Sequence, residues 1–190
     1  MGKKKFERII TEFKQNHLKG EKEPIRATDS FAKAKSPLKQ INPPLTKMFY
    51  EGVPRILNSG ISIFPCFARN DNRTALETYP AQLARIFTGR YKNIKPEDKH
   101  YPNKNPRELI ISGLLSLDMT QKLGFSIQIE KKLISLAIED NKGDILDSFL
   151  CTVQAGWAWT KKNYSYGISR KVDNKIILEG WIMGYSSPDK

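Results

Sequence analysis

The sequence predicts an α/β fold with few strands for a length of 190 residues. Apolar residues recur at helical spacing in several segments, whereas three short runs, at 61–64, at the residues before Glu77 and at 175–182, have the pattern of strands. Two or three strands make a poor sheet on their own. We therefore expect either a partner chain that completes the sheet or strands that lie upstream of this chain.

The first 60 residues predict two helices joined by a long polar connection. Within residues 1–17, Phe6, Ile9, Ile10 and Phe13 line one face of an amphipathic helix whose apolar face is too short for membrane binding. Residues 18–44 are rich in Lys and Pro, lack a clear period and predict a long irregular loop. A second helix follows the prolines at 43–44, with Pro54 as a candidate kink.

The remaining elements alternate between short strands and helices. After the strand at 61–64 comes a turn at 70–72, the strand that ends at Glu77, and a helix that Pro80 opens. A basic loop with two tyrosines spans 90–107. Helical spacing then marks segments around 109–117, 129–137 and 144–157, and the run at 175–182 predicts a closing strand.

Composition favours a single domain over residues 1–190 and a polyanionic partner. Lys and Arg number 32 against 20 Asp and Glu, a net charge of +12 that favours nucleic acid first and an anionic membrane second. Cys66 and Cys151 lie in apolar runs and are expected to be reduced core residues. The chain has neither a signal-peptide core nor an apolar run of membrane-spanning length, so we expect a cytoplasmic protein without a membrane partner.

Three acidic residues are the candidates for chemistry. Glu77 ends an apolar strand, and α/β proteins place chemistry at the carboxyl ends of strands. An exposed Glu in a strand-to-helix loop is the alternative. Asp144 and Asp147 stand three apart at the start of an apolar helix. Helix capping and the helix dipole are their alternative roles, but capping does not explain Asp147 within so apolar a stretch.

A series of short motifs resembles a known family. In order, they are Ser36-Pro37-Leu38-Lys39, Asn42-Pro43-Pro44, Lys47-Met48-Phe49, Glu51-Gly52, Pro54-Arg55, Glu77-Thr78-Tyr79-Pro80-Ala81, Tyr91-Lys92, Asp147-Ser148 and Glu179-Gly180-Trp181-Ile182. Together they resemble domain of unknown function 429, a group described as predicted nucleases of ribonuclease-H-like fold. The likeness covers about residues 24 to 183.

The resemblance implies a mixed sheet flanked by helices, with carboxylates gathered around Mg²⁺ or Mn²⁺. Glu77 matches the later-strand metal ligand and Asp147 the final-helix ligand, with Asp144 beside it. Such ions prefer oxygen ligands, and a pair of them activates water and stabilises the leaving oxygen in phosphodiester cleavage. The family opens with a Gly-Ile-Asp strand that this sequence lacks, and Asp29 is expected to cap a turn. The chain thus resembles the carboxyl-terminal part of a longer protein, either truncated or split.

Basic and aromatic residues complete the candidate site. Arg26, Lys47, Arg55 and Lys92 are the candidates for phosphate contacts, with solvated surface charge as the alternative for each. The three tryptophans, Trp157, Trp159 and Trp181, are able to stack on bases, but their apolar neighbours favour core packing.

The sequence therefore predicts metal-dependent hydrolysis of phosphodiesters in nucleic acid, with Glu77 and Asp147 as ligands and Asp144 as an auxiliary. The first alternative is a non-catalytic remnant of the same fold that binds nucleic acid or a partner chain. The second is a fragment with little stability of its own.

Overall fold

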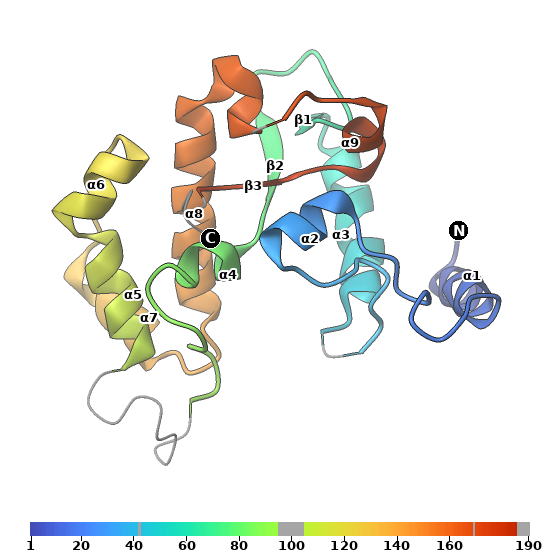
Figure 1. The fold of residues 1–190 in the computed structure, drawn as a ribbon, viewed down its shortest axis with the longest axis horizontal. Helices are drawn as coiled ribbons and strands as arrows, with labels where there is room; N and C mark the ends of the chain where they lie inside the picture. The colour runs from blue at the N-terminus through green and yellow to red at the C-terminus, as the bar shows by residue number, and fades with distance from the viewer. Residues whose placement is uncertain (42, 95–104, 169, 186–190) are drawn as a thin grey trace. The chain divides into compact units, whose positions relative to one another are not determined.

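The computed structural model describes residues 1–41, 43–94, 105–168 and 170–185. The fold is α/β, with 53% helix and one small sheet in the strand order β1-β2-β3 (Figure 1). The predicted fold class and scarcity of strands are confirmed at this level, and the ribonuclease-H-like assignment stays a prediction. The elements in chain order are α1 (Lys3–Gln15), α2 (Ala27–Ala32), α3 (Leu45–Asn58), β1 (Ser62–Phe64), β2 (Thr74–Thr78), α4 (Pro80–Ala84), α5 (Pro106–Leu114), α6 (Leu117–Leu123), α7 (Lys131–Glu139), α8 (Asp144–Thr160), the 3-10 helix η1 (Lys162–Gly167), α9 (Asn174–Glu179) and β3 (Ile182–Met183).

The chain forms two compact units. The first contains residues 1–77 and 172–182, and the second contains residues 78–171 and 183–190. The chain passes between the units three times, after Glu77 in β2, after Lys171 in the connection that precedes α9, and after Ile182 in β3. The single domain expected for residues 1–190 stays a prediction.

The first unit has a small core beside a parallel strand pair. β1 and β2 pair in register, with Ser62 opposite Thr74. Trp181 is buried and its ring centroid lies 5.7 Å from that of Phe31. The hydroxyl of buried Thr28 accepts a 2.7 Å hydrogen bond from the backbone N–H of Ile182, which ties α2 to β3.

In the same unit, α1 packs on α3. The rings of Phe6 and Tyr50 lie 5.0 Å apart, and Lys3 forms a 2.9 Å ion pair with Glu51. Phe6, one of the four apolar residues of the predicted amphipathic helix at 1–17, therefore contacts another helix, whereas Ile9 of the same set is 42% exposed.

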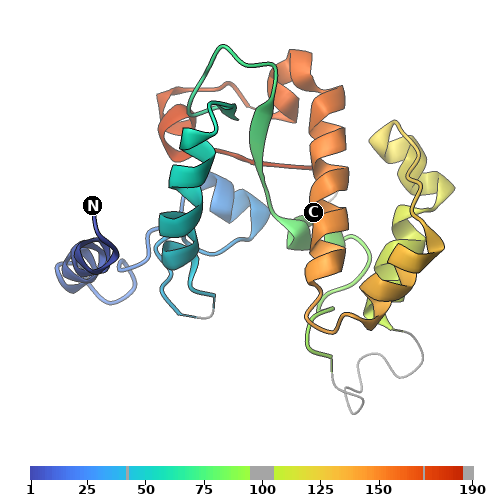
Figure 2. The same cartoon turned by 180° about the vertical axis from the view of Figure 1, so that it is seen from behind.

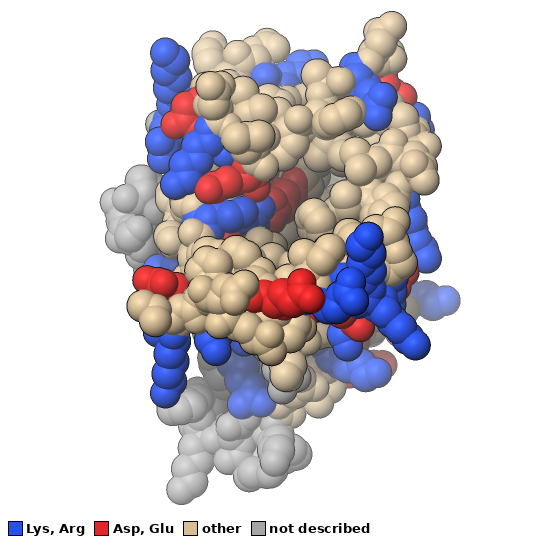
Figure 3. All heavy atoms as spheres, turned by 90° about the vertical axis from the view of Figure 1, so that its right-hand side faces the viewer, with Lys and Arg blue, Asp and Glu red and all other residues tan. Residues whose placement is uncertain are grey.

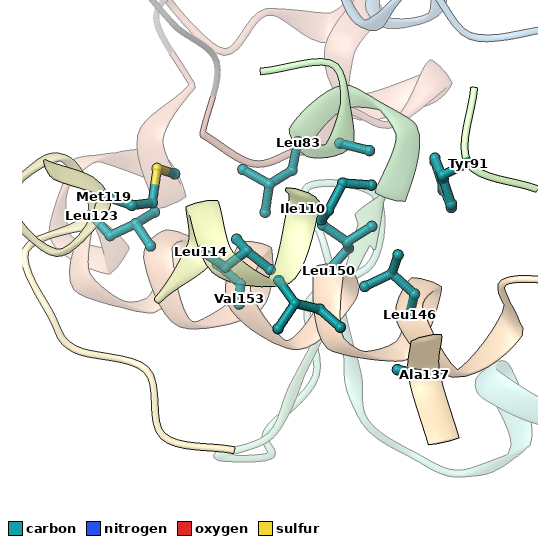
Figure 4. Packing of buried hydrophobic residues seen from close by; sticks show 12 residues of the cluster. Leu83, Tyr91, Ile110, Leu114, Met119, Leu123, Ala137, Leu146, Leu150 and Val153 are labelled. Carbon is teal, nitrogen blue, oxygen red and sulfur yellow. The ribbon is translucent and has the colours of Figure 1, made fainter. Parts of the chain in front are cut away.

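The second unit holds the main hydrophobic core, built around α8 (Figures 1 and 2). Leu146, Leu150 and Val153 recur at helical spacing along α8 and point into the cluster. Ile110 and Leu114 of α5, which are fully buried, belong to the same cluster, and Figure 4 shows them together with the α8 residues. Burying a leucine side chain stabilises a fold by roughly 1.5–3 kcal/mol, so this cluster is the principal source of the second unit's stability.

Two predictions of secondary structure were wrong. The predicted loop at 18–44 contains α2, which begins where the Asp29 carboxylate accepts a 3.0 Å hydrogen bond from the backbone N–H of Arg26. The predicted strand at 175–182 is mostly helix α9, and only its last residues join the sheet. Asp173 caps α9 by accepting a 2.9 Å hydrogen bond from the N–H of Ile176, which favours a helix over a strand at that point.

Smaller differences concern one helix boundary and one cysteine. The helix expected around 109–117 ends at Leu114, and Ser116 caps a separate helix, α6. Cys66 is exposed, so its expected core position was wrong, whereas Cys151 is partly buried; both are free thiols. Residues 95–104 of the predicted basic loop, with the second of its two tyrosines, lie outside the described residues. Within the described residues, none of the helices combines the length and apolarity that a membrane span requires.

Candidate functional site

Glu77, at the carboxyl end of β2, is ion-paired with Arg26. Its two carboxylate oxygens accept hydrogen bonds from the Arg26 Nη1 at 2.9 Å and Nη2 at 2.6 Å. Arg26 also donates from Nε and Nη2 to Asp29, at 3.0 and 2.7 Å, and from Nη1 to the backbone carbonyl of Glu179 at 2.8 Å. All five N–H donors of the guanidinium are thereby used. We call Arg26, Asp29, Glu77 and Glu179 the Arg26 cluster.

The Arg26 cluster is partly sealed from water. Asp29 is 1% exposed, whereas the side chain of Glu77 is 42% exposed. Burial alone would lower the pKa of Arg26, but the hydrogen bonds that it donates to Glu77 and Asp29 outweigh that cost and raise the pKa. Burial, with the nearby charge of Glu77, raises the pKa of the Cys66 thiol, which therefore stays protonated at neutral pH. The cluster joins α2, the end of β2 and the end of α9 through one cationic side chain.

Asp147, on the first turn of α8, has its own cationic partner. The Tyr91 hydroxyl donates to Oδ1 at 2.7 Å, and the Lys92 ammonium donates to Oδ2 at 2.5 Å. Asp144 lies 3.9 Å from the same ammonium and is 76% exposed. Burial, assisted by the hydrogen bond to Asp147, raises the pKa of Tyr91, so its hydroxyl stays a donor at neutral pH. These contacts fix residues 91–92 against the start of α8.

Helix capping accounts for neither Asp144 nor Asp147. The residue before α8 is Gly143, and the backbone N–H of Ile145 is bound instead by the carboxylate of Asp140, at 3.0 Å. That hydrogen bond lowers the pKa of Asp140. The capping alternative for Asp144 is therefore wrong. Asp147 is a half-buried ion-pair partner.

The other predicted phosphate contacts lie on α3. Lys47 is exposed, 3.8 Å from Glu7, and Arg55 is exposed in the last turn. Figure 3 shows Lys and Arg side chains projecting at many places on the face that carries α1, with fewer Asp and Glu between them. Lys47 and Arg55 are accessible to a polyanion, whereas Arg26 and Lys92 are engaged with carboxylates of the protein.

Each predicted metal ligand contacts a cation of the protein, and the divalent-ion site stays a prediction. Glu77 belongs to the first unit and Asp147 to the second, so their convergence stays a prediction. Within its own unit each carboxylate already contacts a cation, Arg26 or Lys92. Among the described residues, no three or more His, Cys, Asp and Glu side chains are grouped so as to hold a metal ion.

An aromatic and basic segment at the end of α8 is a feature that sequence reasoning missed. Trp159 is 54% exposed, and the Lys162 ammonium lies 4.2 Å above its ring. Core packing was correctly expected for Trp181, which is 6% exposed, and for Trp157, which meets Tyr185 edge-on at 6.2 Å. The expectation of core packing was wrong for Trp159. Residues two apart on a helix point about 200° from each other, so neighbouring tryptophans of this spacing cannot both face the core.

Comparison with known proteins gives no match, so the description of the site depends on its geometry. No family model, curated protein or solved structure matches the chain. The resemblance to domain of unknown function 429 therefore stays a prediction.

Proposed function

We propose that this protein binds nucleic acid and does not cleave it. The observation that supports the proposal is the pairing of both predicted catalytic carboxylates with cations, Glu77 with Arg26 and Asp147 with Lys92. In each unit the negative charge that would recruit a metal ion is offset by a side chain of the protein.

Metal-dependent hydrolysis requires carboxylate oxygens that are open to the ions and to the phosphate. An ion bound at Glu77 would displace a guanidinium that makes five hydrogen bonds, two of them to an almost fully buried Asp29. Stranding a buried charge costs several kcal/mol, so displacement of Arg26 is unfavourable. Cleavage with Mg²⁺ or Mn²⁺ is the competing proposal, and it needs Arg26 and Lys92 to release their partners.

The charge of the chain supports a polyanionic ligand. Lys and Arg exceed Asp and Glu by 12, and α1 alone carries Lys3, Lys4, Lys5 and Arg8 in its first turns with no buried residue. Lysines of this kind contact phosphates, and their binding releases counterions from the nucleic acid.

Binding and cleavage are measured together in one titration. Fluorescently labelled 20-nucleotide DNA and RNA are mixed with the protein at 50 to 200 mM salt, in EDTA or in Mn²⁺, and samples are run on a denaturing gel. We expect salt-sensitive binding and intact oligonucleotide in both conditions. Absence of binding at 50 mM salt overturns the proposal. Cleavage that disappears in both Glu77→Gln and Asp147→Asn establishes the competing one.

A further inference from the structure

We infer that the end of α8 is a binding site for single-stranded nucleic acid, in which bases stack on Trp159 and Tyr164 and phosphates contact Lys161 and Lys162. These four residues are the stacking site. The inference rests on the proposed function, which it deepens by naming the ligand class and the residues that hold it.

The aromatic rings of the stacking site face solvent. Trp159 is 54% exposed and Tyr164 is 78% exposed, although both belong to the well-packed second unit. An exposed tryptophan on a small protein forgoes burial of one of the largest apolar side chains. Bases stack on such rings whatever their sequence, because every base presents a π-face.

Two lysines lie between the two aromatic residues in the sequence. The Lys162 ammonium lies 4.2 Å above the Trp159 ring, and Lys161 is exposed. A cation over an indole is attracted by the ring. A base that stacks on that face displaces the Lys162 ammonium, which then pairs with a phosphate of the same strand. The charge is therefore complementary to a nucleic-acid strand, and the rings provide the platform.

The backbone after α8 is held in an uncommon conformation that exposes Tyr164. Ser165 and Tyr166 have φ angles of 52° and 54°, in the left-handed region that residues other than glycine seldom adopt. Gly167 then packs so closely on Trp157 that a Cβ there would lie 2.5 Å from the indole ring. Strained backbone is concentrated at functional positions. Here it turns the chain so that Gly167 packs on Trp157 while Tyr164 is exposed to solvent.

The composition of the segment favours a nucleic acid over a membrane as its ligand. Between Trp159 and Tyr164 the residues are Thr, Lys, Lys and Asn, and Ser follows. Helices that lie in a membrane interface present a broad apolar face, and the polar residues of this segment do not form one. Duplex nucleic acid keeps its base faces within the stack, so only unpaired bases reach the rings.

The test compares single-stranded and duplex forms of one 16-nucleotide DNA by fluorescence anisotropy. Trp159→Ala is expected to raise the dissociation constant for the single strand roughly tenfold to a hundredfold, the range that loss of one stacked base gives. Its control is Leu117→Ala, which truncates an exposed apolar residue of the same unit. Lys161→Gln with Lys162→Gln is compared with Lys131→Gln with Lys132→Gln, a pair of adjacent exposed lysines on α7.

Intrinsic fluorescence provides a second readout. Stacking on Trp159 is expected to quench tryptophan emission, and Trp159→Phe, which keeps a ring, should retain binding but lose most of the quenching. Circular dichroism of each variant confirms that it is folded.

The outcomes separate the inference from the function on which it rests. If wild-type protein binds neither form at low salt, the proposed function fails. If it binds both forms equally and Trp159→Ala changes nothing, the stacking site is wrong and the proposed function stands. Binding to vesicles of anionic lipid in place of the oligonucleotide would also overturn the inference.

Discussion

Replacing Asp29 with Asn is the sharpest test of the Arg26 cluster as a structural centre. The Asp29 carboxylate is 1% exposed and accepts three hydrogen bonds from Arg26, at 3.0 Å from the backbone N, 3.0 Å from Nε and 2.7 Å from Nη2. Removing one partner of a buried pair costs about 3–5 kcal/mol. Because Glu77 still neutralises Arg26, we expect Asp29→Asn to lower the free energy of unfolding by about 3 kcal/mol.

Glu77→Gln is the matched comparison within the same cluster. The side chain of Glu77 is 42% exposed, so water screens the Arg26–Glu77 ion pair and solvates Arg26 when the charge of Glu77 is removed. We expect a loss of about 1 kcal/mol.

Urea unfolding followed by far-ultraviolet circular dichroism measures both variants. With a slope of about 2 kcal/mol per molar urea, the midpoint should fall by about 1.5 M for Asp29→Asn and about 0.5 M for Glu77→Gln. The reasoning is refuted if Asp29→Asn is no more destabilising than Glu77→Gln, because burial would then not decide the strength of these contacts.

Three further predictions concern the second unit. Tyr91→Phe removes a hydrogen-bond donor to Asp147 and should lower the free energy of unfolding by about 1 kcal/mol, measured by thermal unfolding. Because the pKa of Tyr91 is raised, this stabilisation is fully present below about pH 10 and is lost as the pH rises further. Gly167→Ala should destabilise the fold by roughly 1–3 kcal/mol in urea, since its Cβ would meet Trp157. For Asp140, whose pKa is lowered, stability declines as the pH falls below about 4, and Asp140→Asn should flatten that decline in an acid titration.

The helices of the second unit are predictable because their stability comes from a repeating pattern. Leu146, Leu150 and Val153 recur on one face of α8, and that spacing is visible in the sequence. In contrast, α2 and α9 are six residues long and depend on single side chains, Asp29 and Asp173, that bind backbone N–H groups. A short apolar run contains too few residues to show a helical or a strand period. At 175–182 the Asp173 cap therefore determines that the segment is mostly helix.

The candidate carboxylates could be selected from the sequence, but their partners could not. Arg26 is 51 residues from Glu77, and Lys92 is 55 residues from Asp147, so only tertiary structure reveals that each acid contacts a base. Neighbouring apolar residues likewise concealed the exposure of Trp159. The spacing from Trp157, opposite on the helix, is the signal that would have revealed it.

The most direct test of non-catalytic binding is a single anisotropy measurement with labelled single-stranded DNA, made in Mn²⁺ and in EDTA and followed for several hours. We predict that Mn²⁺ weakens binding only by screening the phosphates, and to the same extent in the wild type and in Asp147→Asn, and that the signal stays constant with time in both solutions. A signal that decays only in Mn²⁺, and only when Glu77 and Asp147 are intact, would show that these carboxylates leave their cations to bind metal and would contradict the proposal.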